Sequence, residues 1–352
     1  DCRGKEGDKK NCSGDGLRCD EKVPENEKIY EGFHCPSCAN SCRFYKKWIE
    51  GKKIEFHKQS NAYSNQKEKA ESNNGATNNK EFLEKLKQYE SIHLFLDSLK
   101  NGPCKNNNDE SGTVKTENSH IKFDDAKTFV HTNLCDPCSK FKIKCENGYC
   151  SGGDGDTKEK CDGKTDISAE DIETIGKSPA ELIMRISDNG SNGFEGDGLQ
   201  QACGSANIFK GIREDKWKCR NVCGVHICKR ENEGDKKYIT MKELLKRWLE
   251  YFFQDYNRIQ KKLKPCTKND KGSKCIKGCV EKWIEEKRKE WKTINDNYLK
   301  KYKSGDDGGN NLTNFLEQLQ SLTELDKVMQ PCESLDKFKA LLKCNDTDSS
   351  KK

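Results

Sequence analysis

Apolar side chains recur at helical spacing along much of the chain. The clearest case runs from Met241 to Leu263, where the apolar positions fall at spacings of three and four: Leu245, Trp248, Leu249, Phe252, Tyr256, Ile259 and Leu263. The pattern also predicts helices over 41–70 and 80–100, and short helices within 166–186. No stretch alternates apolar and polar residues convincingly, as a half-buried strand does, and 135–161 is predicted to be cross-linked coil. We therefore predict a mainly α fold.

Part of this pattern occurs twice. A Trp-Ile-Glu motif, an aromatic residue eight positions on and a tyrosine fifteen positions on begin at Trp48 and again at Trp283. A Cys-x3-Cys pair precedes each copy, and Phe82-Leu-Glu corresponds to Phe315-Leu-Glu further on. The helix predicted before the second copy has no counterpart before the first. We therefore expect the chain to start inside its first domain.

The repeat predicts three parts. Residues 1–104 would be a helical subdomain that lacks its N-terminal portion, 105–134 a linker that begins with polar residues, and 135–352 a second helical unit. The aromatic residues of each copy recur about every two helical turns, so we expect them to form a buried stripe. An exposed aromatic rim that binds a ligand is the alternative.

The chain has 21 cysteines but only 32% hydrophobic residues, which leaves little material for a large core. Disulfides in an oxidising, extracellular compartment would compensate for thin cores. A zinc site or a redox Cys-x2-Cys motif would leave most of the cysteines unexplained, so we predict neither a metal nor a cofactor. The odd count leaves one cysteine whose partner we expect before Asp1. The predicted disulfide cysteines are Cys35, Cys38, Cys42, Cys104, Cys135, Cys138, Cys145, Cys150, Cys219, Cys223, Cys266, Cys275, Cys279 and Cys332.

The spacing of the Cys-x3-Cys pairs suggests how they are used. Cys38/Cys42, Cys219/Cys223 and Cys275/Cys279 would each lie on one face of a helix. Helical geometry holds such neighbours apart, so we expect each cysteine to bridge to another element. The sequence leaves the pairing open.

The net charge of +6 conceals an uneven distribution. Residues 43–69 carry 8 basic and 3 acidic residues, and 236–303 carry 21 and 9, whereas 151–199 carry 5 and 12. Runs of cations on helices can bind a sulfated polysaccharide by displacing its counterions, although a solvated helix face is as good an interpretation for any single run. The predicted glycosaminoglycan contacts are Arg43, Lys46, Lys47, Lys52, Lys53 and Lys58, followed by Lys261, Lys262, Lys264, Lys287, Arg288, Lys289 and Lys292.

No arrangement of residues suggests catalysis. The histidines are scattered, and the chain lacks a His-Glu-x-x-His motif, a nucleophile elbow and a phosphate-binding glycine loop. We therefore predict that the protein is not an enzyme. The basic runs could also bind nucleic acid, but an extracellular, disulfide-rich chain rarely meets it, so we predict no nucleic-acid partner.

The motifs resemble a known family. The string Trp-Ile-x-x-Lys-Lys-x-Glu-Phe-x-x-Gln from Trp48, with the cysteines before it, resembles the third, helical subdomain of Duffy-binding-like domains. Cys135-Asp-Pro-Cys138, Trp217-x-Cys219 and Leu-Leu-Lys-Arg-Trp248 resemble the cysteine-rich interdomain region (CIDR) of the malaria parasite's variant erythrocyte-surface adhesins, erythrocyte membrane protein 1 of Plasmodium falciparum. Within that family the chain is most similar to the placental type that binds chondroitin sulfate A.

The resemblance implies disulfide-stapled helical bundles and a non-enzymatic adhesin on the outer face of the infected erythrocyte, anchored by a segment outside this chain. It implies a chondroitin sulfate A proteoglycan as ligand, with neighbouring domains of the adhesin and host antibodies as other partners. Two alternatives remain open. One is a module for a host protein such as CD36 or the endothelial protein C receptor, and the other is a structural spacer between domains.

Overall fold

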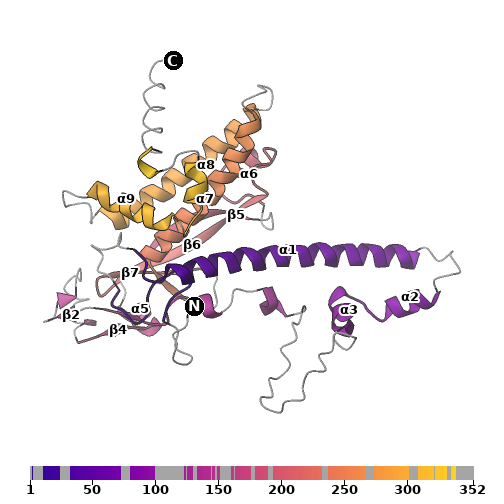
Figure 1. Ribbon diagram of the computed structural model, residues 1–352, viewed down its shortest axis with the longest axis horizontal. Helices are drawn as coiled ribbons and strands as arrows, with labels where there is room; N and C mark the ends of the chain where they lie inside the picture. Colours follow the sequence, from indigo (N-terminus) through magenta and orange to yellow (C-terminus); the bar gives the residue numbers. More distant parts are fainter. Residues whose placement is uncertain are drawn as a thin grey trace, which may run out of the picture. The chain divides into compact units, whose positions relative to one another are not determined.

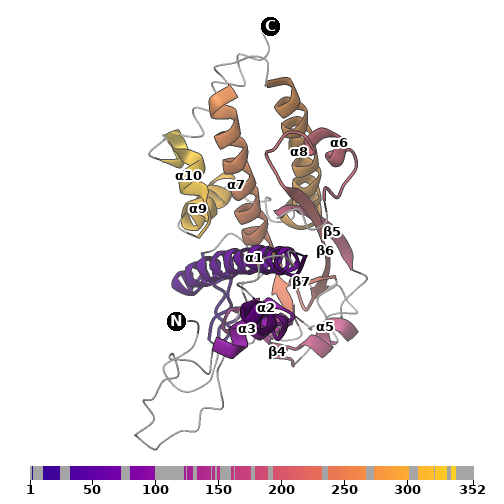
Figure 2. The same cartoon turned by 90° about the vertical axis from the view of Figure 1, so that its right-hand side faces the viewer.

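The structure is a computed structural model of the 352-residue chain (Figures 1 and 2). It divides into two compact units, which we describe separately: unit 1 comprises Asp1–Cys42 and Leu134–Lys352, and unit 2 comprises Arg43–Asn133. No helix among the described residues is both long enough and apolar enough to cross a bilayer. The described residues are 2, 11–23, 32–72, 80–99, 123, 125–129, 133–143, 145–146, 149–150, 160–161, 163–175, 179–188, 193–231, 237–266, 273–300, 308–320, 322–330 and 334–337.

Unit 2 is built on one long helix. Helix α1 runs from Pro36 to Ser72, with its first residues in unit 1 and the remainder in unit 2 (Figure 1). The helix predicted over 80–100 is present as two short helices, α2 (Lys80–Lys87) and α3 (Ile92–Leu99), followed by a 3-10 turn at Ala126–Phe129. The break falls at 88–91, where the Ser91 carbonyl accepts from the Phe95 amide at 3.2 Å and starts a new helix.

Unit 1 contains a sheet that the sequence analysis did not predict. Four antiparallel strands lie in the order β5 (Ala180–Asp188), β6 (Gly211–Val222), β7 (Val225–Arg230) and β8 (Tyr238–Thr240). In β5 the side chains of Leu182, Met184 and Ile186 enter the core. Ile183 lies on the other face, and this apolar residue concealed the alternation.

This strand corrects one prediction in part. Among the described residues of 166–186, α5 (Ala169–Ile175) is the one helix, and it follows the two-residue strand β4 (Asp166–Ile167). The coil predicted over 135–161 contains three further two-residue strands, β1 (Phe141–Lys142), β2 (Cys145–Glu146) and β3 (Tyr149–Cys150). β1 pairs with β4, and β2 pairs with β3. The described chain is nevertheless mainly helical, as predicted.

Helices pack on one face of the four-stranded sheet. The predicted helix over 241–263 is confirmed as α7 (Met241–Cys266), and α8 (Ser273–Ile294), followed by a π-helical turn at Asn295–Leu299, lies beside it (Figure 2). The other α-helices in the described part of unit 1 are α6 (Leu199–Cys203), α9 (Gly308–Leu319) and α10 (Leu325–Met329). The main core joins Leu182 and Trp217 of the sheet to Leu245, Tyr298 and Phe315 of the helices.

Helix α7 begins with a capping box. The Glu243 carboxylate accepts from the Thr240 amide at 2.9 Å, and the Thr240 hydroxyl accepts from the Glu243 amide at 3.3 Å. The other oxygen of Glu243 accepts from the hydroxyl of Ser13 at 2.6 Å, so the cap also binds the N-terminal loop. The chain segment before α1 therefore packs against the beginning of α7.

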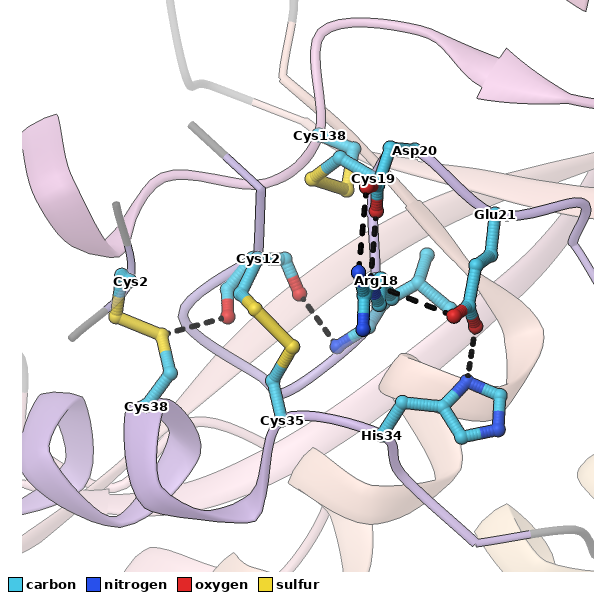
Figure 3. The surroundings of a disulfide bond; sticks show 12 residues. Cys2, Cys12, Arg18, Cys19, Asp20, Glu21, His34, Cys35, Cys38 and Cys138 are labelled. Carbon is cyan, nitrogen blue, oxygen red and sulfur yellow. Dashed lines mark hydrogen bonds and ion pairs between the residues drawn. A yellow bond between two sulfur atoms is a disulfide. The ribbon is translucent and has the colours of Figure 1, made fainter. Parts of the chain in front are cut away.

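Disulfides hold the same segment in place. Cys12–Cys35 and Cys2–Cys38 join it to the start of α1, and Cys19–Cys138 joins it to the chain beyond Leu134 (Figure 3). Around them, Arg18 contacts Asp20 and Glu21, and Glu21 contacts His34. The other disulfides among the described residues are Cys42–Cys135, Cys145–Cys150, Cys161–Cys223, Cys203–Cys279 and Cys219–Cys228.

Most of the predicted disulfide cysteines are therefore bonded. Cys104 and Cys332 lie outside the described residues, and the side chains of Cys266 and Cys275 are also outside them. One expectation was wrong: Cys219 lies in strand β6 and Cys223 in the turn after it, so this pair is not on a helix. Cys219 bonds across the ladder to Cys228, its directly opposite residue on β7.

Candidate ligand-binding surfaces

The first group of predicted cations lies on α1. Lys52, Lys53 and Lys58 are exposed, and Arg43, Lys46 and Lys47 are partly exposed. The Lys52 ammonium lies 2.7 Å from the Glu55 carboxylate, an exposed pair that stabilises the helix little. From Arg43 to Lys58 the helix carries these six cations and only two carboxylates, Glu50 and Glu55. The structure thus gathers the first group along one helix.

The aromatic stripe of α1 is only partly buried. Phe56 stacks on Phe123 with 5.3 Å between ring centroids and also contacts Phe129 at 5.2 Å. Tyr63 donates its hydroxyl to the backbone carbonyl of Tyr89 at 2.8 Å, and burial raises the pKa of this phenol. These two positions pack within unit 2, as expected for a core stripe.

Trp48 does not follow this pattern. Its side chain is 56% exposed, and Phe44, one helical turn earlier, is 58% exposed. In the second copy of the repeat, the corresponding Trp283 is only 3% exposed and stacks on Phe252 of α7 at 5.3 Å. The prediction that these tryptophans are buried therefore holds for Trp283 and is wrong for Trp48. The reason is that no described residue covers Trp48 as α7 covers Trp283.

The cations of α7 and α8 are less available. Lys261 and Lys262 are exposed near the end of α7, and the side chain of Lys264 lies outside the described residues. On α8, Lys287 is buried at 4% exposure and donates to the Glu290 carboxylate at 2.9 Å and to the Arg185 carbonyl at 2.5 Å. Its charge is neutralised in the interior, which removes Lys287 from the candidate contacts.

The rest of the α8 group faces solvent. Arg288 and Lys292 are exposed, as is Lys289, which pairs with Glu285 at 2.7 Å and with Glu286 at 2.9 Å. The contact with Lys289 holds the pKa of the Glu285 carboxyl below its usual value, so Glu285 remains charged at neutral pH. This face therefore alternates the two signs of charge.

The sheet adds a cationic hollow that the sequence analysis missed. A hollow of about 480 Å³ is lined by Lys218 and Arg220 of β6 and by Lys229 of β7, with Glu173 and Tyr238 beside them. Glu173 accepts from the Tyr238 hydroxyl at 2.5 Å and pairs with Arg220 at 3.3 Å. The signal was the alternating run Lys216-Trp-Lys-Cys-Arg220, which places its cations on one face of a strand.

The described residues show no metal centre built from free ligands. The sulfur atoms of Cys2, Cys38 and Cys42 lie within 4.8 Å of one another, but each belongs to a disulfide. A metal binds thiolates, which these sulfur atoms are not.

Comparisons with known proteins match separate parts of the chain. A family model of the Duffy-binding-like domain, C-terminal subdomain, matches residues 1–133, and a model of the PFEMP1 DBL domain matches 244–352. A model of the Cysteine-Rich Interdomain Region 1 gamma matches 179–232. Each copy of the internal repeat thus falls within a match to a Duffy-binding-like model.

A solved structure matches most of the chain. It is the N-terminal NTS-DBL1-alpha and CIDR-gamma double domain of the PfEMP1 protein from the Plasmodium falciparum varO strain, with 27% sequence identity and a TM-score of 0.59. The match covers 92% of this chain and 49% of the other, so the chain spans about half the length of that double domain. No curated protein matches the sequence.

Proposed function

We propose, on the premise that these matches identify the chain as a PfEMP1 fragment with Duffy-binding-like and CIDR parts, that it contributes to adhesion of infected erythrocytes. In this proposal the chain does not act as an enzyme. Its ligand in this proposal is chondroitin sulfate A on a host proteoglycan, as in the placental type of the family. Its location is the outer face of the erythrocyte membrane, as part of a larger anchored protein.

One observation carries the proposal. The α1 helix presents six cations against two carboxylates over Arg43–Lys58, and Lys52, Lys53 and Lys58 are exposed. A sulfated polysaccharide is a regular polyanion, and binding it releases the counterions condensed along its chain. The Lys261 and Lys262 pair is a secondary site, whereas the mixed charges of α8 would repel the polyanion as well as attract it.

A protein receptor is supported less well. Binding to a protein surface usually depends on a cluster of exposed aromatic or aliphatic anchors. In unit 1, which contains the CIDR match, the large exposed apolar side chains among the described residues are Leu134, Leu263 and Ile284, on three different elements. Single exposed apolar residues of this kind are ordinary on a protein surface. In unit 2, the exposed Phe44 and Trp48 lie among lysines, which are depleted in the cores of protein interfaces.

The test is chondroitin sulfate A binding by the full chain at several salt concentrations. We expect the logarithm of the affinity to fall linearly with the logarithm of the salt concentration. In the Lys53→Glu, Lys58→Glu double variant, affinity should fall at least about 10-fold and the salt dependence should become shallower. Lys277→Glu is the matched control, because Lys277 is also an exposed helical lysine but lies outside the predicted clusters.

Two results would reject this function. One is an affinity that does not depend on salt, and the other is a double variant that binds as the wild type does. If the folded wild-type chain binds no chondroitin sulfate A at low salt, the result favours a structural spacer between domains instead. Unsulfated chondroitin should bind weakly or not at all, because it has fewer anionic groups per repeat.

A further inference from the structure

The two copies of the Trp-Ile-Glu repeat differ in the cover over their tryptophans. Trp283 lies under Phe252 of α7, and one turn earlier Cys279 is bonded to Cys203 of α6. In α1 the corresponding positions are Trp48 and Phe44, and both are more than half exposed. The first copy therefore presents two large aromatic side chains where the second copy buries one tryptophan and a disulfide-bonded cysteine.

Both exposed rings lie on one face of α1. Phe44 and Trp48 are four residues apart on α1, so they lie one helical turn apart on the same face. The Tyr45 ring lies 6.0 Å from the Trp48 ring, and the Arg43 guanidinium lies over the Phe44 ring at 4.7 Å. Beside them, the position that a Cβ would take at Gly51 has no atom within 4 Å. Open space thus adjoins the exposed rings.

Charge surrounds the rings. Helical periodicity places Lys47 and Lys58 on the same face as Phe44 and Trp48, with the Lys52–Glu55 pair next to them. Glu55 is the carboxylate on this face, and its charge is matched by Lys52. The aromatic pair therefore lies in a cationic surrounding.

The combination of rings and lysines indicates the chemistry of the partner. Lysine is depleted in the cores of protein–protein interfaces, so a lysine-rich rim around two aromatic rings suits a protein partner poorly. Proteins that bind single-stranded nucleic acid, another polyanion, use the same combination. Their cations follow the charged backbone, and their aromatic rings stack on its cyclic units. Pyranose rings have an apolar C–H face that can pack on an indole in the same way.

We propose that Phe44 and Trp48 form a stacking platform for the sugar rings of a sulfated polysaccharide, while the neighbouring lysines of α1 contact its sulfate and carboxylate groups. This inference rests on the proposed function and adds a non-ionic component to it. The platform would select chains whose sulfates leave one face of the ring free, which a purely ionic site does not do.

The test separates the two components of binding. Affinity of the full chain for chondroitin sulfate A is measured over a salt series for Phe44→Ala, Trp48→Ala and the double variant. We expect the double variant to bind at least about 10-fold more weakly at every salt concentration, with an unchanged salt dependence. Trp48→Phe should recover most of the affinity, and Leu99→Ala, at an exposed apolar residue of α3, is the matched control.

Tryptophan fluorescence supplies a second measurement. Trp48 is the exposed indole among the described residues, since Trp217, Trp248 and Trp283 are buried and Trp291 is half-buried. Bound polysaccharide should protect the wild-type chain from quenching by acrylamide, and Trp48→Phe should abolish this protection.

The outcomes distinguish the inference from the function on which it rests. If the wild type binds and the aromatic double variant binds equally well, the platform is wrong and the ionic proposal stands. If the aromatic variants bind more weakly and their affinity also depends less on salt, then the rings act by positioning the lysines. Stacking is rejected in that case too. If the wild type does not bind, both proposals fail.

Discussion

Lys287 and Glu290 form a buried ion pair one turn apart on α8, with the ammonium 2.9 Å from the carboxylate and both side chains almost fully covered. The same carboxylate accepts from the Trp248 indole at 2.7 Å and from the Arg185 amide at 2.7 Å. The pair thus joins α8 to α7 and to strand β5. In the first copy of the repeat, Lys52 and Glu55 have the same sequence relationship and a 2.7 Å contact, but they are exposed.

This contrast makes a prediction about stability. Lys287→Ala should lower the free energy of unfolding by about 3–5 kcal/mol, because it leaves the Glu290 charge buried without its cation. Lys52→Ala should cost less than about 1 kcal/mol, as for other exposed pairs. Urea unfolding of both variants gives the comparison. Equal losses of unfolding free energy in the two variants would show that Lys287 is not held in the interior.

A second buried pair predicts how the N-terminal loop is held. The Arg247 guanidinium contacts one oxygen of Asp15 at 2.9 and 2.6 Å, and Lys246 lies 3.4 Å from the other oxygen. Asp15→Ala should therefore destabilise unit 1 by about 3–5 kcal/mol, because Arg247 loses this carboxylate and the buried Lys246 is left with Glu250 at 3.7 Å. Asp20→Ala, in an exposed pair with Arg18, should change stability by less than about 1 kcal/mol. A small loss in Asp15→Ala, measured by chemical unfolding, would contradict this packing.

The disulfides should contribute unequally. Cys42–Cys135 closes a segment of 93 residues, whereas Cys145–Cys150 closes one of 5. Chain entropy then predicts losses of about 3–5 kcal/mol for the Cys42→Ser, Cys135→Ser variant and about 2 kcal/mol for the Cys145→Ser, Cys150→Ser variant. Thermal unfolding of the two double variants under oxidising conditions shows which of them loses more stability. The reverse order would show that packing around each bond outweighs loop closure.

Acid should weaken the cap of α5. The Lys164 ammonium, 2.7 Å away, together with the Ser168 amide and hydroxyl, lowers the pKa of the Asp171 carboxyl from 3.8 to about 2. A lowered folded-state pKa gives stability that is complete above the unfolded value and disappears as the pH falls through the folded value. Between pH 4 and pH 2 the wild type should thus lose on the order of 1 kcal/mol from this group, after allowance for solvent screening.

Asp171→Asn is the variant that checks this assignment. It should be less stable than the wild type at pH 6, and the difference should narrow as the pH approaches 2. Unfolding curves recorded at several pH values decide the matter. A difference that stays constant with pH would mean that Asp171 acts as a hydrogen-bond acceptor without contributing charge.

Much of the helical structure could be predicted from the sequence, because helical periodicity is a local property. Apolar spacing predicted α7 within a few residues of its ends, and the repeated Trp-Ile-Glu motif lies on α1 and α8 as expected. Strand β5 was missed because Ile183 is apolar on the outer face and made the alternation look continuous. The cysteine content indicated disulfides, but pairing depends on distances between segments that lie far apart in the chain.

The sequence by itself determined the periodic elements of this protein, its dependence on disulfides and its excess of cations on α1. Only the tertiary structure decided which members of equivalent pairs are accessible. Lys52 and Lys287, like Trp48 and Trp283, occupy the same repeat positions and have nearly the same neighbours along the helix. Burial is set by what packs against the helix from elsewhere in the chain, here α7 and the sheet over α8, and the local sequence of a helix contains no record of that cover.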